Sequence, residues 1–180
     1  KGAKGKISTM NFFIKVVKQL YGLHNFSAIS AISAGFQHAA IHRLRPYWGE
    51  ITKSKMTMVE SIFVRVASAN NFATFRAELK QTSLPLIPYL GMYLTDLTFM
   101  DEGNPDFVTS PGGVKLINFS KRRRVSLVIR DIQQFQLTPY KLIPLKVIQS
   151  YIKGASTYDD ETLWKVSEQT IPKGQNKLTL

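Results

Sequence analysis

The segment Pro85–Asp106, with the sequence PLIPYLGMYLTDLTFMDEGNPD, is the most informative stretch of the chain. It is strongly apolar, yet polar and acidic side chains run through it and gather near its end, at the turn Gly103-Asn104-Pro105. Carboxylates at the C-terminal end of a helix oppose the helix dipole. A helix that only fills a core has no reason to concentrate acids there. A contact surface and a core helix with a solvated end are the two interpretations that composition leaves open.

The charge pattern of the whole chain makes these acids unusual. The 180 residues include 24 Lys and Arg against 12 Asp and Glu, a net charge of +12. Between Lys80 and Lys115, however, there is no basic residue, and this interval holds Asp96, Asp101, Glu102 and Asp106, one third of all the acids. A basic balance is typical of proteins that bind nucleic acids or anionic membranes. The local reversal of sign needs a different explanation.

Composition also excludes several kinds of functional site. The sequence contains no cysteine, which excludes disulfide scaffolds, thiol nucleophiles and cysteine-ligated metals. His38 and His42 have a metal-ligand spacing, but they lack the acid and the third ligand of a zinc protease. We therefore expect ordinary packing or surface histidines, no metal site and no catalytic nucleophile.

Apolar residues recur at helical spacing along most of the chain, and prolines fall between the periodic segments. Strict alternation of apolar and polar residues is nearly absent, so no sheet is expected. The pattern predicts an all-α domain of seven or eight helices, with a loop at Thr109–Gly113. The periodic segments lie at about residues 10–21, 27–40, 59–66, 72–79, 125–135 and 157–164.

Three motifs then follow one another in order: YLTDLTFMDEGNPD (Tyr93–Asp106), LINFSKRRRV (Leu116–Val125) and IRDIQQFQLTPYKL (Ile129–Leu142). Together with Leu20–Trp48 and Trp164–Gly174, they resemble the catalytic domain of Ras-family guanine-nucleotide exchange factors, the RasGEF domain. The resemblance extends from near Lys6 to about residue 173. It implies a single all-helical domain over residues 1–180 with a projecting helical hairpin. Because the family's domain begins with further helices, we expect this domain to be N-terminally incomplete.

The resemblance implies a non-covalent exchange factor that releases GDP from a small GTPase of Ras, Rap or Ral type. The first hairpin helix would cover roughly Leu94–Gly103. The stretch near Asn118–Gln136 would be either the second hairpin helix or a helix that buttresses the second hairpin helix. By matching positions, Thr95 and Thr98 would contact the displaced switch 1 and the magnesium site. Glu102 would attract the phosphate-loop lysine of the GTPase, because a carboxylate can replace a phosphate as its partner.

Other residues are assigned to the GTPase surface by the same resemblance. A pocket for switch 2 would use Phe72, Tyr89, the neighbourhood of Ser30, and Gln37. For the basic run Lys121–Arg124, which follows a helix start, a solvated helix end, pairing with the acids of 96–106, a phosphate contact and a partner surface all stay open. The remaining assigned contacts are Asp96, Leu97, Asp101, Asn104, Lys121 and Arg124.

Two other functions are weighed beside exchange. Gln37-His38 stand where the family commonly has Asn-Ser, which motivates a GTPase-binding or regulatory module that does not exchange nucleotide. The net charge motivates a nucleic-acid or membrane binder, but no reading motif accompanies it. We expect no specific nucleic-acid partner, no cofactor, and a cytoplasmic protein recruited to membranes through transient contact with anionic lipid.

Overall fold

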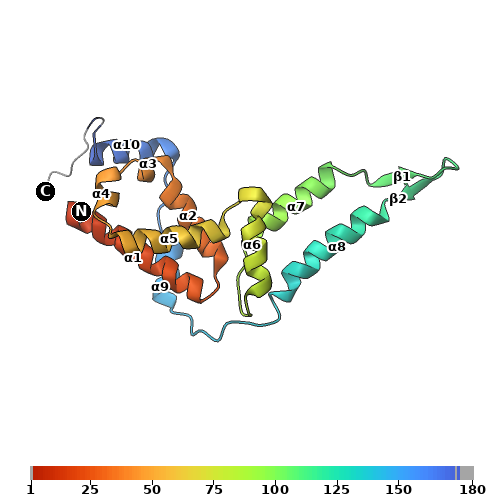
Figure 1. Cartoon of the computed structure of the whole chain (residues 1–180), viewed down its shortest axis with the longest axis horizontal. Helices are drawn as coiled ribbons and strands as arrows, with labels where there is room; N and C mark the ends of the chain where they lie inside the picture. The colour runs from red at the N-terminus through yellow and green to blue at the C-terminus, as the bar shows by residue number, and fades with distance from the viewer. Residues whose placement is uncertain (1, 173, 175–180) are drawn as a thin grey trace. The chain divides into compact units, whose positions relative to one another are not determined.

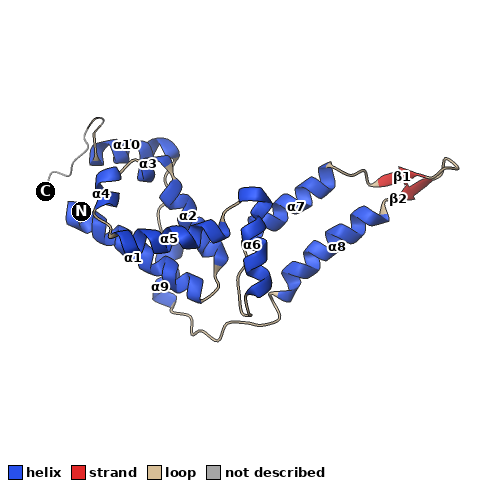
Figure 2. Cartoon of the chain, in the orientation of Figure 1, coloured by secondary structure: helices blue, strands red, loops and turns tan. Residues whose placement is uncertain are grey.

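The computed structural model describes residues 2–172 and residue 174, and this part of the chain is mainly helical (Figures 1 and 2). The predicted all-α class is confirmed. The helices are α1 (Ala3–Gly22), α2 (Phe26–Gln37), α3 (Ala39–His42), α4 (Arg45–Gly49), α5 (Lys53–Val66), α6 (Ala69–Gln81), α7 (Leu90–Glu102), α8 (Phe119–Gln134), α9 (Lys146–Lys153) and α10 (Asp160–Thr170). Two short strands, β1 (Phe107–Thr109) and β2 (Lys115–Ile117), complete the described elements.

The described helices outnumber the seven or eight predicted because α3 and α4 are only 4 and 5 residues long. One helical turn is too short to establish a hydrophobic period.

The chain divides into two compact units, residues 1–19, 31–63 and 140–180 in the first and residues 20–30 and 64–139 in the second. No helix among the described residues is long and apolar enough to cross a bilayer.

The first unit packs apolar residues of α1, α4 and α5 into a core that includes Ile14, Val17, Tyr47 and Val59. Helix α10 packs on α3, and Arg43, at the C-terminal end of α3, bonds to α10. The Arg43 guanidinium donates hydrogen bonds to the Ser167 carbonyl at 2.8 Å and to the Ile171 carbonyl at 2.8 Å. These bonds satisfy carbonyl groups at the C-terminal end of α10, where a cation is electrostatically favourable.

The two histidines of the HAAIH motif differ in their surroundings. His38 precedes α3, where its Nδ1 accepts a hydrogen bond from the Ala40 N–H at 3.3 Å, and its Nε2 lies 3.3 Å from Asp160 Oδ1. His42 is exposed. The described residues contain no group of three or more potential ligands that could hold a metal ion.

The second unit is centred on two fully buried phenylalanines, Phe26 and Phe75, whose rings meet edge to face with centroids 5.3 Å apart. Glu78 of α6 accepts a hydrogen bond from the Tyr21 hydroxyl at 2.6 Å and pairs with Arg65 at 2.8 Å. The aromatic contact and these polar bonds fix α6, against which α7 is placed.

Helices α7 and α8 pack side by side and form the helical hairpin of the second unit (Figure 1). Strands β1 and β2 pair antiparallel at its end, with Val108 opposite Leu116. The sequence did not predict this sheet because three-residue strands cannot show an alternating pattern. The connecting turn closes with a hydrogen bond from Ser110 N–H to the Val114 carbonyl at 2.9 Å, and Gly113 adopts a φ of +79° that favours glycine.

Truncation of the buried aromatic pair should destabilise the second unit strongly. We expect Phe75→Ala to lower the free energy of unfolding by about 3–5 kcal/mol, since it removes a buried ring and leaves a cavity. The control is Phe119→Ala, because the Phe119 side chain is 75% exposed; its effect should stay below about 0.5 kcal/mol. Urea denaturation followed by circular dichroism measures both, and equal effects would contradict the assigned core.

Candidate functional site

One face of α7 is exposed along most of its length. Leu94, Thr98 and Glu102 follow one another at intervals of four residues and form an exposed stripe. Thr95 and Phe99 lie beside it; Thr95 is half-buried, whereas 67% of the Phe99 surface is exposed. Three residues that the sequence singled out, at positions 95, 98 and 102, thus share one helix face.

The two threonines of this face bond to their own helix. Thr95 Oγ1 donates to the Gly91 carbonyl at 2.8 Å, and Thr98 Oγ1 donates to the Leu94 carbonyl at 3.0 Å. A hydroxyl that donates to the carbonyl four residues earlier holds the branched side chain in one rotamer. These side chains can therefore contact a partner by shape, without offering a free donor proton.

A second face of α7 is directed to α6. Asp96 pairs with Arg76 of α6 at 2.8 Å, and its side chain is only 16% exposed. Met92 is buried in the core of this unit, and Leu97 is half-buried. Asp96 therefore joins two helices of the chain and does not belong to the exposed face.

The end of α7 carries an ion cluster formed by Lys121, Asp101, Asp106 and Arg122, here called the Lys121 cluster. Lys121 Nζ lies 2.7 Å from Asp101 Oδ1 and 2.8 Å from Asp106 Oδ1, and its side chain is only 3% exposed. The same ammonium donates to the Asp101 carbonyl at 3.1 Å. Arg122 adds an exposed pair to Asp106 at 3.0 Å. The sequence left four alternatives open for the basic run, and for Lys121 the structure shows pairing with the acids.

The Lys121 cluster explains why acids collect at a helix end where the dipole disfavours them. The buried ammonium brings positive charge to the C-terminal end of α7, and the carboxylates compensate that buried charge. Hydrogen bonds to Asp101 and then Asp106 raise the pKa of Lys121 above its usual value. The hydrogen bond from Lys121 lowers the pKa of Asp106.

Glu102 differs from the acids around it. It is exposed, and within the described part of the chain its carboxylate makes no hydrogen bond or ion pair. Asn118 helps to fix the adjoining turn, since its Nδ2 donates to the Pro105 carbonyl at 2.9 Å and its Oδ1 accepts from Lys121 N–H at 3.1 Å. The end of the hairpin is thus held by internal bonds while one carboxylate stays available.

The predicted switch 2 residues lie in both units. In the second unit, Phe72 and Tyr89 have ring centroids 6.0 Å apart, and Phe72 adopts an uncommon left-handed φ of +58°. The Ser30 hydroxyl is buried without a hydrogen-bond partner among the described residues. In the first unit, exposed Gln37 donates from Nε2 to Ser33 Oγ at 2.8 Å. The structure therefore brings Phe72 and Tyr89 together.

The last two assigned contacts lie on the hairpin. Asn104 Nδ2 donates to the Met100 carbonyl at 3.1 Å, in the turn after α7. Arg124 is exposed on α8 and has no partner in the described part of the chain. Arg124 therefore fits the solvated or partner-facing alternative that the sequence left open for the basic run.

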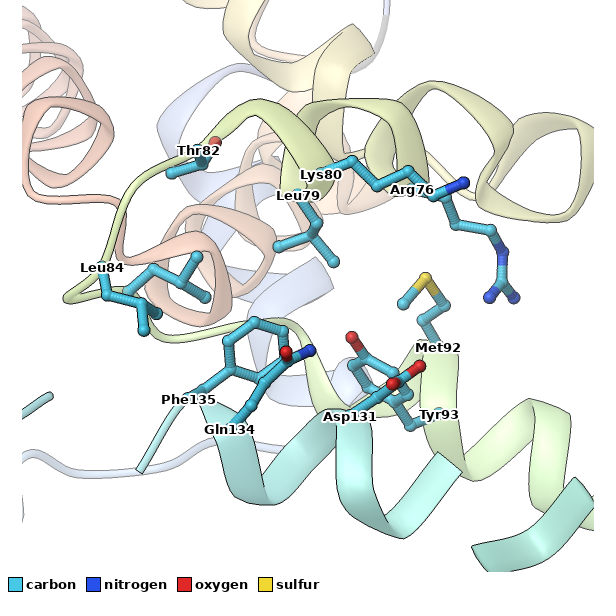
Figure 3. A pocket seen from close by; sticks show the side chains of 11 residues that line it. Arg76, Leu79, Lys80, Thr82, Leu84, Met92, Tyr93, Asp131, Gln134 and Phe135 are labelled. Atoms are coloured by element: carbon cyan, nitrogen blue, oxygen red, sulfur yellow. The ribbon is translucent and has the colours of Figure 1, made fainter. Parts of the chain in front are cut away.

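A pocket of about 520 Å³ also lies in the second unit, and side chains of α6, α7 and α8 face one another across it (Figure 3). Its lining includes Leu79, Met92 and Phe135 beside the charged Arg76 and Asp131. Burial, followed by the Asp131 carboxylate, raises the pKa of Tyr93 to about 12. Sequence periodicity identified Leu79 and Phe135 as apolar helix positions but gave no signal for a pocket.

Comparisons with known proteins match most of the chain. Residues 1–123 match the family model described as the RasGEF domain. Ras-specific guanine nucleotide-releasing factor 1 of Rattus norvegicus is 37% identical over 169 residues, 93% of this chain and 13% of that protein. Ras guanine nucleotide exchange factor A of Dictyostelium discoideum is 38% identical over 151 residues, 83% of this chain and 25% of that protein. The chain therefore spans a quarter or less of these relatives.

The Lys121 cluster should stabilise the chain most between acidic and strongly alkaline pH. Asp106, with a lowered pKa, contributes stability above its usual 3.8, and this is lost as pH falls through the lowered value. Lys121, with a raised pKa, contributes stability below its usual 10.5, and this is lost as pH rises through the raised value. In an NMR titration, Lys121→Met should raise the pKa of Asp106. An unchanged Asp106 titration would contradict the pairing.

Proposed function

The chain belongs to the RasGEF domain family, and on this basis we propose that it accelerates GDP release from a small GTPase of the Ras subfamily. The observation that carries the proposal is the exposed face of α7, which combines internally bonded threonines with the unpaired carboxylate of Glu102. The names of the relatives, which are releasing and exchange factors, support the same activity.

In the proposed mechanism, α7 of the α7–α8 hairpin enters the GTPase beside the nucleotide. Thr95 and Thr98 would occupy space that switch 1 and the magnesium site need when nucleotide is bound. Their hydroxyls already donate within the helix, so bulk and shape are what they would supply. The magnesium ion and the nucleotide belong to the GTPase, and no covalent step is involved.

Glu102 would act at the phosphate-binding loop. Its carboxylate would pair with the lysine that otherwise holds the β-phosphate. The new bond would be charge-assisted, like the lysine–phosphate bond that it replaces. Asp96 pairs with Arg76, and Asp101 and Asp106 pair with Lys121. Glu102 is therefore the one acid of Pro85–Asp106 without a partner in the described chain, which supports its assignment to this role.

The energetics require the hairpin to weaken nucleotide binding. A picomolar nucleotide corresponds to about −16 kcal/mol, which contacts with the nucleotide-free GTPase must largely offset. By linkage, nucleotide and exchange factor weaken each other's binding by the same factor. A face that replaces both the steric and the electrostatic partners of the nucleotide site meets this requirement.

The wider contact surface is proposed with one change from the sequence-based assignment. Phe72, Tyr89, Gln37, Leu97, Asn104 and Arg124 stay proposed GTPase contacts. Asp96, Asp101 and Lys121 form ion pairs within the chain, and we assign them the role of holding the hairpin in place in the free protein.

The net charge of +12 further favours transient contact with anionic membranes, the surface to which Ras-type GTPases are anchored.

Exchange activity is tested directly by release of fluorescent GDP from purified Ras-, Rap- and Ral-type GTPases. We expect the chain to accelerate release from at least one of them, and excess unlabelled GDP to slow formation of the complex. Acceleration of none, together with binding to nucleotide-free GTPase, would favour the non-exchanging module. Absence of both would contradict the proposal.

Removal of the unpaired carboxylate should slow exchange without unfolding the chain. Glu102→Ala removes one charge-assisted bond of about 1.5–3 kcal/mol from the nucleotide-free complex. The exchange rate should fall by about 10- to 150-fold. Glu60→Ala is the matched control, because Glu60 is also an exposed helical glutamate without a partner in the described chain.

The control should exchange at the wild-type rate, and both variants should keep the wild-type melting temperature. Thr98→Glu should lose at least as much activity as Glu102→Ala, since it adds charge and bulk to the same face. Unfolding by Glu102→Ala would show that this carboxylate is structural.

A further inference from the structure

Two neighbouring acids at the end of α7 have opposite environments. Asp101 is bonded to Lys121 through both its carboxylate and its backbone carbonyl, whereas Glu102 is exposed and unpaired in the described chain. Lys121 comes from α8, twenty residues away in sequence. A single ammonium group therefore connects the last turn of α7 to the first turn of α8.

We propose that Lys121 is a positioning residue for exchange, which fixes the last turn of α7 and thereby aims the carboxylate of Glu102 at the GTPase. The inference rests on the proposed function and adds a role that Lys121 performs inside the chain. Lys121 itself does not touch the GTPase in this account, because its side chain is only 3% exposed.

The first argument is mechanical. The last four carbonyls of a helix lack partners within the helix, so a terminal turn frays unless other groups bind it. The Lys121 ammonium binds the Asp101 carbonyl at 3.1 Å, and the Gly103 N–H bonds to the Phe99 carbonyl at 3.0 Å. Glu102 lies between these two bonds in sequence, so its backbone is held on both sides.

The second argument concerns charge. Asp101 and Asp106 are balanced by Lys121 and Arg122, which leaves Glu102 as the unpaired acid at this end of the hairpin in the described part of the chain. Without the ammonium, the carboxylates of Asp101 and Asp106 would lie together with only Arg122 beside them. Their repulsion would open the turn, and Asp101 would compete with Glu102 for the lysine of the GTPase.

The third argument compares neighbouring cations. Arg122 pairs only at the surface, and Arg123 is exposed without a partner in the described part of the chain. Lys121 alone of these three is buried against the end of α7. A positioning role is therefore specific to position 121 and makes Arg123 a matched control.

The test compares Lys121→Met, which keeps most of the length of the side chain and removes its charge, with Lys121→Arg and Arg123→Met. At saturating GTPase, we expect Lys121→Met to slow exchange by about 10- to 100-fold, because a displacement of about 1 Å from the productive position can cost up to about 100-fold. Lys121→Arg keeps the charge and should recover most of this loss. Arg123→Met should exchange at the wild-type rate.

A double-mutant cycle separates positioning from general destabilisation. If Lys121 acts through Glu102, Lys121→Met should cost less than about twofold in a Glu102→Ala background, because the two losses overlap. Independent losses that multiply in the double variant would overturn the positioning role.

Hydrogen exchange of backbone amides tests the same inference without an activity. In Lys121→Met, amides of residues 99–106 should exchange faster while those of α6 stay protected. Unchanged protection at 99–106 would overturn the inference, whatever the kinetics show. A third result separates the two proposals. If hydrogen exchange at 99–106 is faster in Lys121→Met but the unaltered chain accelerates GDP release from no GTPase, Lys121 does hold the last turn of α7 and the proposed function is refuted.

Discussion

The hairpin depends on one buried ammonium group. Removing a lysine from water is costly unless acceptors surround it, and Lys121 finds two carboxylates and a backbone carbonyl. All three acceptors belong to the end of α7 and the turn that follows it. The ammonium can therefore be buried with its charge balanced only when α7 and α8 lie side by side in this register. A buried cation in this way specifies the geometry of two helices.

The three faces of α7 then have separate tasks. One face joins α6 through Asp96 and Arg76, and a second joins α8 through Tyr93, Phe135 and the Lys121 cluster. The third carries Leu94, Thr98 and Glu102 toward solvent. Because the first two faces are fixed by packing and ion pairs, the third face is already ordered before a partner binds. Helix α7 therefore loses little conformational entropy on binding.

Much of this arrangement follows from the sequence. Helical periodicity predicted the all-α class. The acids of Pro85–Asp106 indicated that the end of α7 is either a contact surface or a solvated helix end. The sequence could not separate Lys121 from its neighbours, because four adjacent cations look alike until α8 turns one of them toward α7. It also missed β1 and β2, whose three residues each are too few to show a period. The pocket of α6, α7 and α8 depends on how three helices meet, which no local pattern encodes.

The absence of cysteine from the chain permits the most direct test of hairpin insertion. A single cysteine at Leu94, on the exposed face of α7, can carry a photoactivatable cross-linker, with a cysteine at Glu60 on α5 as the control. The account predicts that the label at position 94 cross-links to peptides of the nucleotide site in nucleotide-free GTPase, and that GDP suppresses this product. Cross-linking at position 94 that is absent, or equally strong with GDP bound, would contradict it.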